Sequence, residues 1–166
     1  NVSGNYRGWT TIREAITRSI NVVAVKTITD VTPTVAIDYL LRFGFTSLEL
    51  EGSNNDYTQS LALGGLTHGV SNLELTAAYA AIANGGVYIE PIFYTKVTDQ
   101  EGNVLLENTQ METRVFKEST SYLLTSAMKD VVTSGTGVPF RLNGMTVAGK
   151  TGTTNYYRDL VFAGFT

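Results

Sequence analysis

A lysine followed by threonine and glycine is the first candidate for chemistry in this chain. Residues 144–151 read GMTVAGKT and fit the phosphate-loop pattern G-x-x-x-x-G-K-[ST]. A phosphate loop requires a flexible glycine-rich turn that leads from a strand into the N-terminus of a helix. The spacer MTVA instead carries two β-branched residues and is typical of a strand, and no helix start follows Lys150. A nucleotide site is therefore disfavoured, and ATP titration of a Lys150→Ala variant would test it.

The alternative chemistry of this strand is the binding of an anion or a reacting hydroxyl. Lys150 supplies positive potential, and Gly152, which has no Cβ, lets a substrate backbone lie against the strand. Two further short motifs accompany KTGT, namely SIN at 19–21 and GTG at 135–137. The competing interpretation is an ordinary exposed lysine on an edge strand, with threonines that only favour β structure. The KTGT motif alone does not decide between the two.

Composition excludes several classes of site. The 166 residues are 43% hydrophobic, which suffices for one core and indicates one domain or part of one. A net charge of −3 without a Lys/Arg cluster disfavours a nucleic-acid partner. The absence of cysteine excludes thiol catalysis and zinc–cysteine sites, and the single histidine excludes His-rich metal clusters. We therefore expect no metal and no cofactor.

The elements that must position these motifs begin with helices. Apolar spacing predicts helices on either side of a polar break at 19–21, and Thr32-Pro33 predicts the start of a third helix that Gly44 ends. The sequence SNLE at 71–74 is a capping box that opens another helix, which ends at 84–86. A last helix begins near 119 and ends at SGTG. Its expected buried stripe is Tyr122, Leu123, Ala127, Met128, Val131 and Val132.

The remaining segments have β character. The turn DQEGN lies between two apolar runs within 87–109 and predicts a hairpin. Residues 144–153 and 160–165 are expected to form two closing strands. This order of elements favours an α+β fold in which an antiparallel β-sheet is flanked by helices.

The motifs together resemble those of a known family. AGKTGTT and SIN resemble the third and second motifs of the penicillin-recognising serine enzymes. TIREAITRSINVVAVK, LALGGLTHGVSNLELTAAYAAIANGGVYIEP, VVTSGTG and AGKTGTTNYYRDLVFAGFT resemble, in the same order, segments of the transpeptidase domain of class A penicillin-binding proteins. This resemblance covers nearly the whole chain. It implies a β-lactamase/transpeptidase-like fold and a peptidoglycan D,D-transpeptidase that cross-links D-Ala-D-Ala stem peptides and is inhibited by β-lactams.

The resemblance also implies a role for each motif residue. Ser19 would share a proton-transfer network with Lys150, and Asn21 would hold the peptide amide of the substrate. Thr151 and Thr153 would bind the carboxylate of a stem peptide or a β-lactam. The backbone N–H of Thr153 would form half of the oxyanion hole, and Gly152 would permit the close approach of the substrate.

The first motif of the family, S-x-x-K with the acylated serine, is expected before SIN, but the 18 residues that precede Ser19 do not contain it. SAMK at 126–129 matches the pattern, but it follows SIN and falls in the middle of a predicted helix. A serine there lacks the free amides and the positive dipole of a helix N-terminus, so we interpret SAMK as a coincidence. We expect residues 1–166 to be the C-terminal portion of one transpeptidase domain whose N-terminal part, with the S-x-x-K helix, is absent. The isolated chain should be inactive.

Three alternatives remain open at this point. A D,D-carboxypeptidase or β-lactamase-like hydrolase would transfer the acyl group to water rather than to an amine, and a non-catalytic peptide-binding module would transfer nothing.

The resemblance further implies a parent protein with a membrane anchor and a glycosyltransferase domain, which acts at the extracytoplasmic face of the membrane. Among other residues, His68 is interpreted as a loop hydrogen-bonder, and Trp9 and the tyrosines as packing residues. Tyr156 and Tyr157 could edge the substrate groove.

Overall fold

The computed structural model describes residues 7–154 and 158–166, and the expectation for Tyr156 and Tyr157 lies outside this range. Helices and strands are both present, and the strands form antiparallel two-stranded sheets. The helices are α1 (Ile12–Thr17), α2 (Asn21–Val31), α3 (Pro33–Arg42), α4 (Asn72–Ala83) and α5 (Glu118–Ser134), with 3-10 turns η1 (Gln59–Leu63) and η2 (Val138–Phe140). The strands are β1 (Val87–Ile89), β2 (Lys96–Thr98), β3 (Val104–Glu107), β4 (Glu112–Arg114), β5 (Ala148–Thr153) and β6 (Leu160–Phe165).

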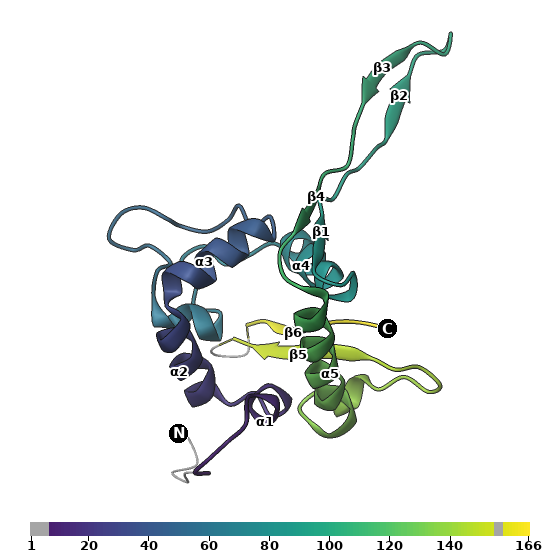
Figure 1. The fold of residues 1–166 in the computed structure, drawn as a ribbon. Helices are drawn as coiled ribbons and strands as arrows, with labels where there is room; N and C mark the ends of the chain where they lie inside the picture. Colours follow the sequence, from purple (N-terminus) through teal and green to yellow (C-terminus); the bar gives the residue numbers. More distant parts are fainter. Residues whose placement is uncertain (1–6, 155–157) are drawn as a thin grey trace.

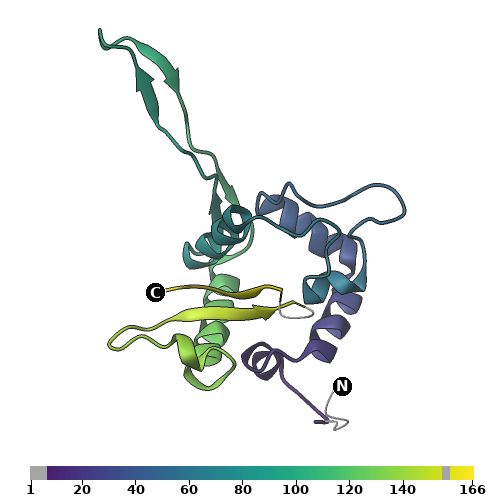
Figure 2. The same ribbon diagram turned by 180° about the vertical axis from the view of Figure 1, so that it is seen from behind.

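These elements are arranged in a ring. Figure 1 shows α2 and α3 along one side, α4 and α5 along the other, α1 at the bottom between α2 and α5, and the β5–β6 pair reaching from α5 toward α2. The same arrangement is seen from behind in Figure 2. Contacts between α5 and β5, between α1 and α5, and between α2 and η1 hold the two sides together. The segments 19–21 and 150–153 thereby face each other.

Helix starts follow local signals in the sequence. The Thr32 hydroxyl accepts a hydrogen bond from the Val35 N–H, and Pro33 occupies the first turn of α3. At α4 the Ser71 hydroxyl accepts from the Glu74 N–H, while the Glu74 carboxylate accepts from the Ser71 N–H, which is a complete capping box. Both predicted helix starts are confirmed.

Two apolar clusters stabilise the fold. One is built around Phe43, Phe45, Ala78, Ala81 and Val115, where α3, α4 and the segment before α5 meet. The other lies where α5 packs on β5, and its buried side chains are Ala127, Met128, Val131, Val132, Val147 and Ala148. Burial of such side chains contributes about 1.5–3 kcal/mol each for the larger aliphatic residues. The second cluster fixes the strand that carries Lys150.

The buried stripe expected for α5 is only partly correct. Ala127, Met128, Val131 and Val132 are buried, but Tyr122 and Leu123 are exposed, and Ser121 is buried in their place. The Ser121 hydroxyl donates to the Ile82 carbonyl, so a short polar side chain fits closely against α4. The helix therefore turns a different face toward the body in its first turns.

The β elements differ in extent from the prediction. The hairpin β2–β3 around DQEGN is confirmed, and it stands away from the body in Figure 1. β1 pairs instead with β4, a strand that the sequence did not indicate. β5 begins at Ala148 rather than at Gly144, whose φ of 75° belongs to a turn. The antiparallel pairing of β5 with β6 is confirmed.

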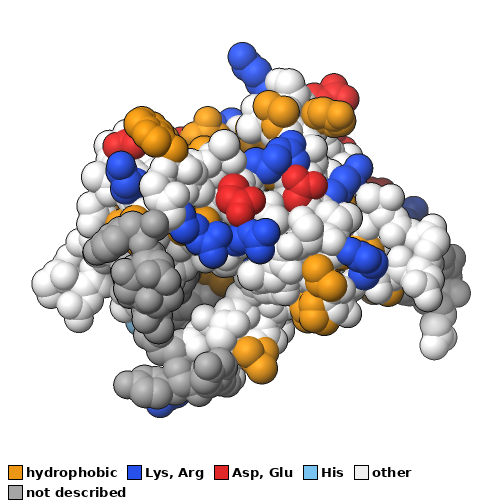
Figure 3. All heavy atoms as spheres, turned by 90° about the horizontal axis from the view of Figure 1, so that it is seen from below, with side chains coloured by type: hydrophobic (Ala, Val, Ile, Leu, Met, Phe, Trp, Pro, Cys, Tyr) orange, Lys and Arg blue, Asp and Glu red, His pale blue; other side chains and the backbone are white. Residues whose placement is uncertain are grey.

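Packing was also wrongly expected for some aromatic residues. Trp9 is fully exposed, and Tyr122 is 72% exposed. Figure 3 shows the face beneath α1, on which basic and acidic side chains are intermingled. The described ion pairs include Arg13–Asp130 and Arg18–Glu14. On this face neither sign of charge dominates.

Candidate active site

Ser19 lies in a tight turn between α1 and α2. Its φ is 54°, and the turn is closed by hydrogen bonds from the Ser19 N–H to the Ile16 carbonyl and from the Ile20 N–H to the Ala15 carbonyl. A left-handed backbone at a residue other than glycine costs about 1–2 kcal/mol. Strain of this kind persists where the surrounding structure holds it, and it is frequent at functional sites. The turn presents the Ser19 side chain toward β5.

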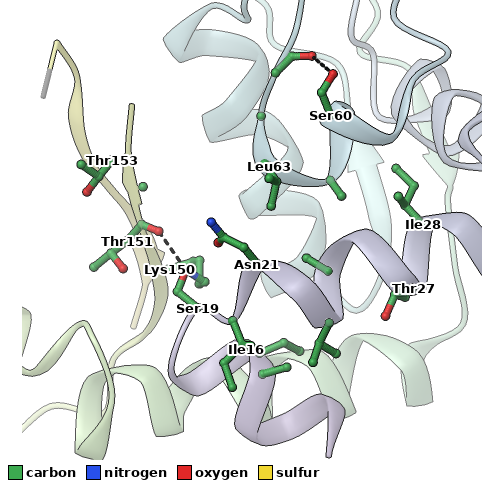
Figure 4. A pocket seen from close by; sticks show the side chains of 18 of the residues that line it. Ile16, Ser19, Asn21, Thr27, Ile28, Ser60, Leu63, Lys150, Thr151 and Thr153 are labelled. Carbon is green, nitrogen blue, oxygen red and sulfur yellow. Dashed lines mark hydrogen bonds between the residues drawn. The ribbon is translucent and has the colours of Figure 1, made fainter. Parts of the chain in front are cut away.

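Asn21 is the first residue of α2, directly after this turn. Figure 4 shows its side-chain amide directed into the space between β5 and the η1 segment. A side-chain amide offers both a donor and an acceptor, so it can hold a peptide group from two sides. The break between α1 and α2 therefore places Ser19 and Asn21 at the same edge of one cavity.

Lys150 joins the two halves of the site. Its Nζ donates to the Ser19 Oγ at 2.7 Å and to the Thr151 carbonyl at 2.9 Å, across a separation of 131 residues in the first case. The side chain is half-buried. Burial lowers the pKa of the Lys150 amine below its ordinary value, because the charged form loses hydration. A lysine of this kind can exchange a proton with a neighbouring hydroxyl more readily than a fully solvated one.

Gly149 and Gly152 of β5 differ in what surrounds them. A Cβ at Gly149 would lie 2.4 Å from the Phe162 ring, so the packing of β6 requires glycine there. A Cβ at Gly152 would meet no described atom closer than the Val161 Cβ at 4.0 Å. The packing of the described chain therefore leaves Gly152 open, as expected for a position that a ligand backbone approaches.

A cavity of about 1480 Å³ lies between these segments. Its polar edge holds Ser19, Asn21, Lys150, Thr151, Gly152 and Thr153, and these are all of the residues expected at the site. Its apolar wall is formed by residues of α1 and α2 such as Ile16, Ala24 and Ile28. The polar groups thus line one side of a largely apolar space, which is typical of a site that orients a ligand by a few hydrogen bonds.

Other parts of the cavity wall were not predicted. The η1 turn contributes Ser60 and Leu63, and Gly65 follows it; the LALGG sequence at 61–65 gave only a turn signal. Thr136 also lines the cavity, and its hydroxyl lies 2.6 Å from the Thr151 hydroxyl. The sequence marked GTG at 135–137 as a motif but did not indicate which segment this loop contacts. Only the folded chain brings it beside β5.

Lys150, Ser126 and His68 lie in surroundings that differ from those of a phosphate loop, a nucleophile and a catalytic base. Lys150 lies within a strand pair that continues to Thr153, so the strand–loop–helix context of a phosphate loop is absent among the described residues. Ser126 lies within α5, where its Oγ accepts a hydrogen bond from Arg13 at 2.9 Å, as expected for a structural serine. The His68 Nε2 lies 3.3 Å from the Glu49 Oε2, which confirms its interpretation as a loop hydrogen-bonder.

Within residues 7–154 and 158–166, no group of three or more His, Cys, Asp or Glu side chains is arranged to hold a metal ion. None of the helices described has the length and apolar character needed to cross a lipid bilayer.

A family model and the curated relatives point to the same protein family. Residues 1–163 match the penicillin-binding protein transpeptidase domain. Penicillin-binding protein 1A of Clostridium botulinum is 36% identical over 162 residues, which is 97% of this chain and 19% of that protein. Penicillin-binding protein 4 of Bacillus subtilis is 35% identical over 166 residues, or 100% of this chain and 26% of that protein. The chain therefore spans about a fifth to a quarter of the length of these relatives.

Solved structures show the same fold at lower identity. The PonA1 protein of Mycobacterium tuberculosis, solved in complex with penicillin V, has a TM-score of 0.83 and 24% identity, with coverage of 100% of this chain and 47% of that one. Penicillin-binding protein 1A of Haemophilus influenzae has a TM-score of 0.78 and 23% identity, with coverage of 99% and 29%. The α+β fold expected from the sequence is thereby confirmed. The chain belongs to the transpeptidase-domain family of penicillin-binding proteins, and its relatives indicate the class A members of that family.

Proposed function

We propose that residues 1–166 form the C-terminal portion of the transpeptidase domain of a class A cell-wall synthase. This domain cross-links peptidoglycan stem peptides that end in D-Ala-D-Ala, through a serine acyl-enzyme, and β-lactams acylate the same serine. One observation carries the proposal: Lys150 Nζ lies 2.7 Å from Ser19 Oγ, and both line one cavity with Asn21. The relative solved with penicillin V supports the β-lactam part.

The proposed roles follow from the donors and acceptors at the polar edge. Ser19 and Lys150 share a proton across their hydrogen bond, so the Ser19 hydroxyl can pass a proton to the leaving D-alanine amine. Asn21 holds the substrate amide from the start of α2. When the nucleophilic serine attacks, a carbon–oxygen bond forms, the carbon–nitrogen bond of the terminal peptide breaks, and the amine leaves with one proton.

Residues of β5 bind the end of the peptide. The hydroxyls of Thr151 and Thr153 donate to the terminal carboxylate, and Lys150 adds a positive charge nearby. The Thr153 backbone N–H provides one donor to the oxyanion. Gly152 lets the substrate backbone approach the strand because no side chain stands there.

The nucleophile comes from the N-terminal part of the same domain, outside the 166 residues. A helix about 10 Å across that rises about 1.5 Å per residue fills roughly 120 Å³ per residue. The cavity of about 1480 Å³ therefore has room for about three helical turns. Its apolar wall of α1 and α2 residues suits a helix that presents one polar turn, with S-x-x-K, toward Lys150.

The same relatives support a proposal about the parent protein. Class A penicillin-binding proteins imply a membrane anchor and a glycosyltransferase domain in other parts of the protein, with the transpeptidase domain at the extracytoplasmic face of the membrane. The substrate partner is then the peptidoglycan stem peptide. Within this proposal no cofactor takes part, since the reaction uses hydroxyl, amine and backbone groups alone.

A pair of lysine variants tests the proposal in the parent protein. Lys150→Met should reduce the rate of acylation by a fluorescent penicillin by about a hundredfold to ten-thousandfold, the usual contribution of a proton-transfer group. Lys129→Met, which changes the exposed lysine of SAMK, is the matched control and should leave acylation unchanged. If Lys150→Met is acylated at the wild-type rate while it remains folded, the proposed function is wrong.

The isolated chain gives a second test. Incubation with benzylpenicillin followed by intact mass spectrometry should show no covalent adduct, because no serine within residues 7–154 and 158–166 combines an adjacent base with oxyanion amides. An adduct on Ser126 or on Ser19 would contradict the assignment of the nucleophile to a segment outside the chain.

A further inference from the structure

The GTG loop at 135–137 contacts both walls of the site, namely the end of α1 and strand β5. None of the roles proposed above uses this loop. On one side, the Thr136 N–H donates to the Thr17 carbonyl at 3.3 Å, two residues before Ser19. On the other side, the Thr136 hydroxyl lies 2.6 Å from that of Thr151, the residue after Lys150. A single residue of the loop therefore contacts both segments that carry the expected site residues.

The close approach of the loop to α1 depends on glycine. A Cβ at Gly135 would lie 2.1 Å from the Thr17 carbonyl oxygen and 2.9 Å from the Val131 Cα. At Gly137 a Cβ would lie 3.2 Å from the Val131 carbonyl, which accepts the Gly137 N–H at 2.9 Å. The two glycines thus allow Thr136 to lie against the end of α1.

An anion in the cavity would favour one direction of the hydrogen bond between the Thr136 and Thr151 hydroxyls. A carboxylate only accepts hydrogen bonds, whereas a hydroxyl has one donor and two acceptor sites. If Thr136 donates to Thr151, the Thr151 hydrogen is free to point into the cavity toward a carboxylate. Hydrogen bonds arranged in such a chain strengthen one another. The Thr136 hydroxyl would therefore orient Thr151 and make it a better donor.

The charges around this edge favour an anionic ligand. Lys150, the residue before Thr151, lines the cavity, and so does Arg158. Asp159 is the acidic side chain at the same edge, and its carboxylate accepts from the Thr154 hydroxyl at 3.2 Å. The two cations, together with the threonine hydroxyls, create a place where a carboxylate is stabilised.

We infer that Thr136 is a positioning residue for carboxylate recognition: its hydroxyl donates to Thr151, which in turn donates to the terminal carboxylate of the stem peptide or β-lactam. This inference rests on the proposed function and extends it to a residue outside the three recognised motifs. Thr136 thus selects ligands that carry a free carboxylate, and it does not take part in the transfer of protons at Ser19.

The experiment compares two probes on the parent protein. Benzylpenicillin carries the carboxylate and its methyl ester does not, and the second-order acylation rate constant is measured for each. Thr136→Val keeps the β-branched shape but removes the hydroxyl. It should lower the rate with benzylpenicillin by about threefold to tenfold, the value of one neutral hydrogen bond, and leave the ester unchanged relative to wild type. Thr136→Ser should restore the rate, and the pH profile should not move.

Controls separate this role from a structural one. Thr133→Val, an exposed position in the last turn of α5, should match wild type with both probes. Thermal unfolding identifies a variant that no longer folds, and Thr136→Ala then replaces Thr136→Val. Equal losses with both probes, no loss with either, or failure of Thr136→Ser to restore the rate would each overturn the inference. If neither probe acylates the wild-type parent protein, the proposed function itself fails and takes this inference with it.

Discussion

The carboxylate of Glu74 offers the sharpest test of how the fold is held together. Its Oε1 accepts from the Thr46 N–H at 2.7 Å, the Thr46 hydroxyl at 3.2 Å and the Ser47 N–H at 3.0 Å. Its Oε2 accepts from the Ser47 hydroxyl at 3.0 Å and the Ser71 N–H at 2.7 Å. One side chain thus ties the segment after Phe45, a core residue, to the start of α4. We predict that Glu74→Gln destabilises the fold in a pH-dependent manner.

The magnitude follows from the pKa of Glu74. Partial desolvation tends to raise this pKa, but the amide N–H groups of Ser71 and Thr46 and the nearby hydroxyls outweigh it and lower the pKa from 4.5 to about 2. One pKa unit corresponds to about 1.4 kcal/mol, so the shift corresponds to roughly 3 kcal/mol before solvent screening. Because the carboxylate is only partly buried, we expect about 1.5–2 kcal/mol at pH 7.

The sign of the pH dependence is defined. A carboxyl group whose pKa is depressed in the folded state adds stability that is complete above its unfolded pKa and is lost as the pH falls through its folded pKa. The difference between wild type and Glu74→Gln should therefore be constant above about pH 5 and shrink steadily from pH 4.5 toward pH 2. Urea unfolding of both proteins at a series of pH values measures it.

Glu118→Gln is the control, since Glu118 is an exposed acidic residue in the first turn of α5. It should lose at most about 0.5 kcal/mol, as is usual for a surface substitution. A Glu74→Gln protein as stable as wild type at pH 7 would refute the reasoning. So would a difference of the same size at pH 2.5 and pH 7, because it would show that the charge is not what the hydrogen bonds stabilise.

Further predictions concern the site and its supports. Gly135→Ala should destabilise the fold by about 1–3 kcal/mol, because the new methyl group meets the Thr17 carbonyl; an unchanged urea midpoint would contradict this packing. Ser126→Ala should leave penicillin acylation of the parent protein intact and cost about 1 kcal/mol of stability through the lost contact with Arg13; loss of labelling in a folded protein would reinstate SAMK. Lys150→Met should not lower the free energy of unfolding at pH 7, since burial disfavours the charged amine in the folded state; thermal unfolding beside the acylation assay checks this.

Signals confined to one turn of the chain were sufficient for much of the fold. The Thr32-Pro33 start, the capping box at Ser71 and Glu74, and the DQEGN hairpin all appear where the sequence places them. Each depends on contacts within four or five residues, for which side-chain chemistry alone sets the preferred backbone. The break between the first two helices is of the same kind, although the structure places it at 18–20 rather than at 19–21, because α1 ends at Thr17 and α2 begins at Asn21.

Features that depend on distant partners were not predicted. The pairing of β1 with β4 joins strands on either side of a long hairpin, and neither strand has an apolar period of its own. The exposed face of α5 was misassigned because apolar spacing does not tell which face meets a neighbour, and the buried contact with α4 is made by the polar Ser121. The proximity of Ser19 to Lys150 was anticipated only through the resemblance to the family, since no local signal connects residues 131 positions apart.

The projecting hairpin of β2 and β3 can vary in length without affecting the cavity. The ribbon pairs with itself and stands clear of the cavity, so no site residue depends on its length or tip. Evolution, or an engineer, could lengthen, shorten or tag the tip near Gln100 while the arrangement of Ser19, Asn21 and Lys150 around the cavity stays as it is.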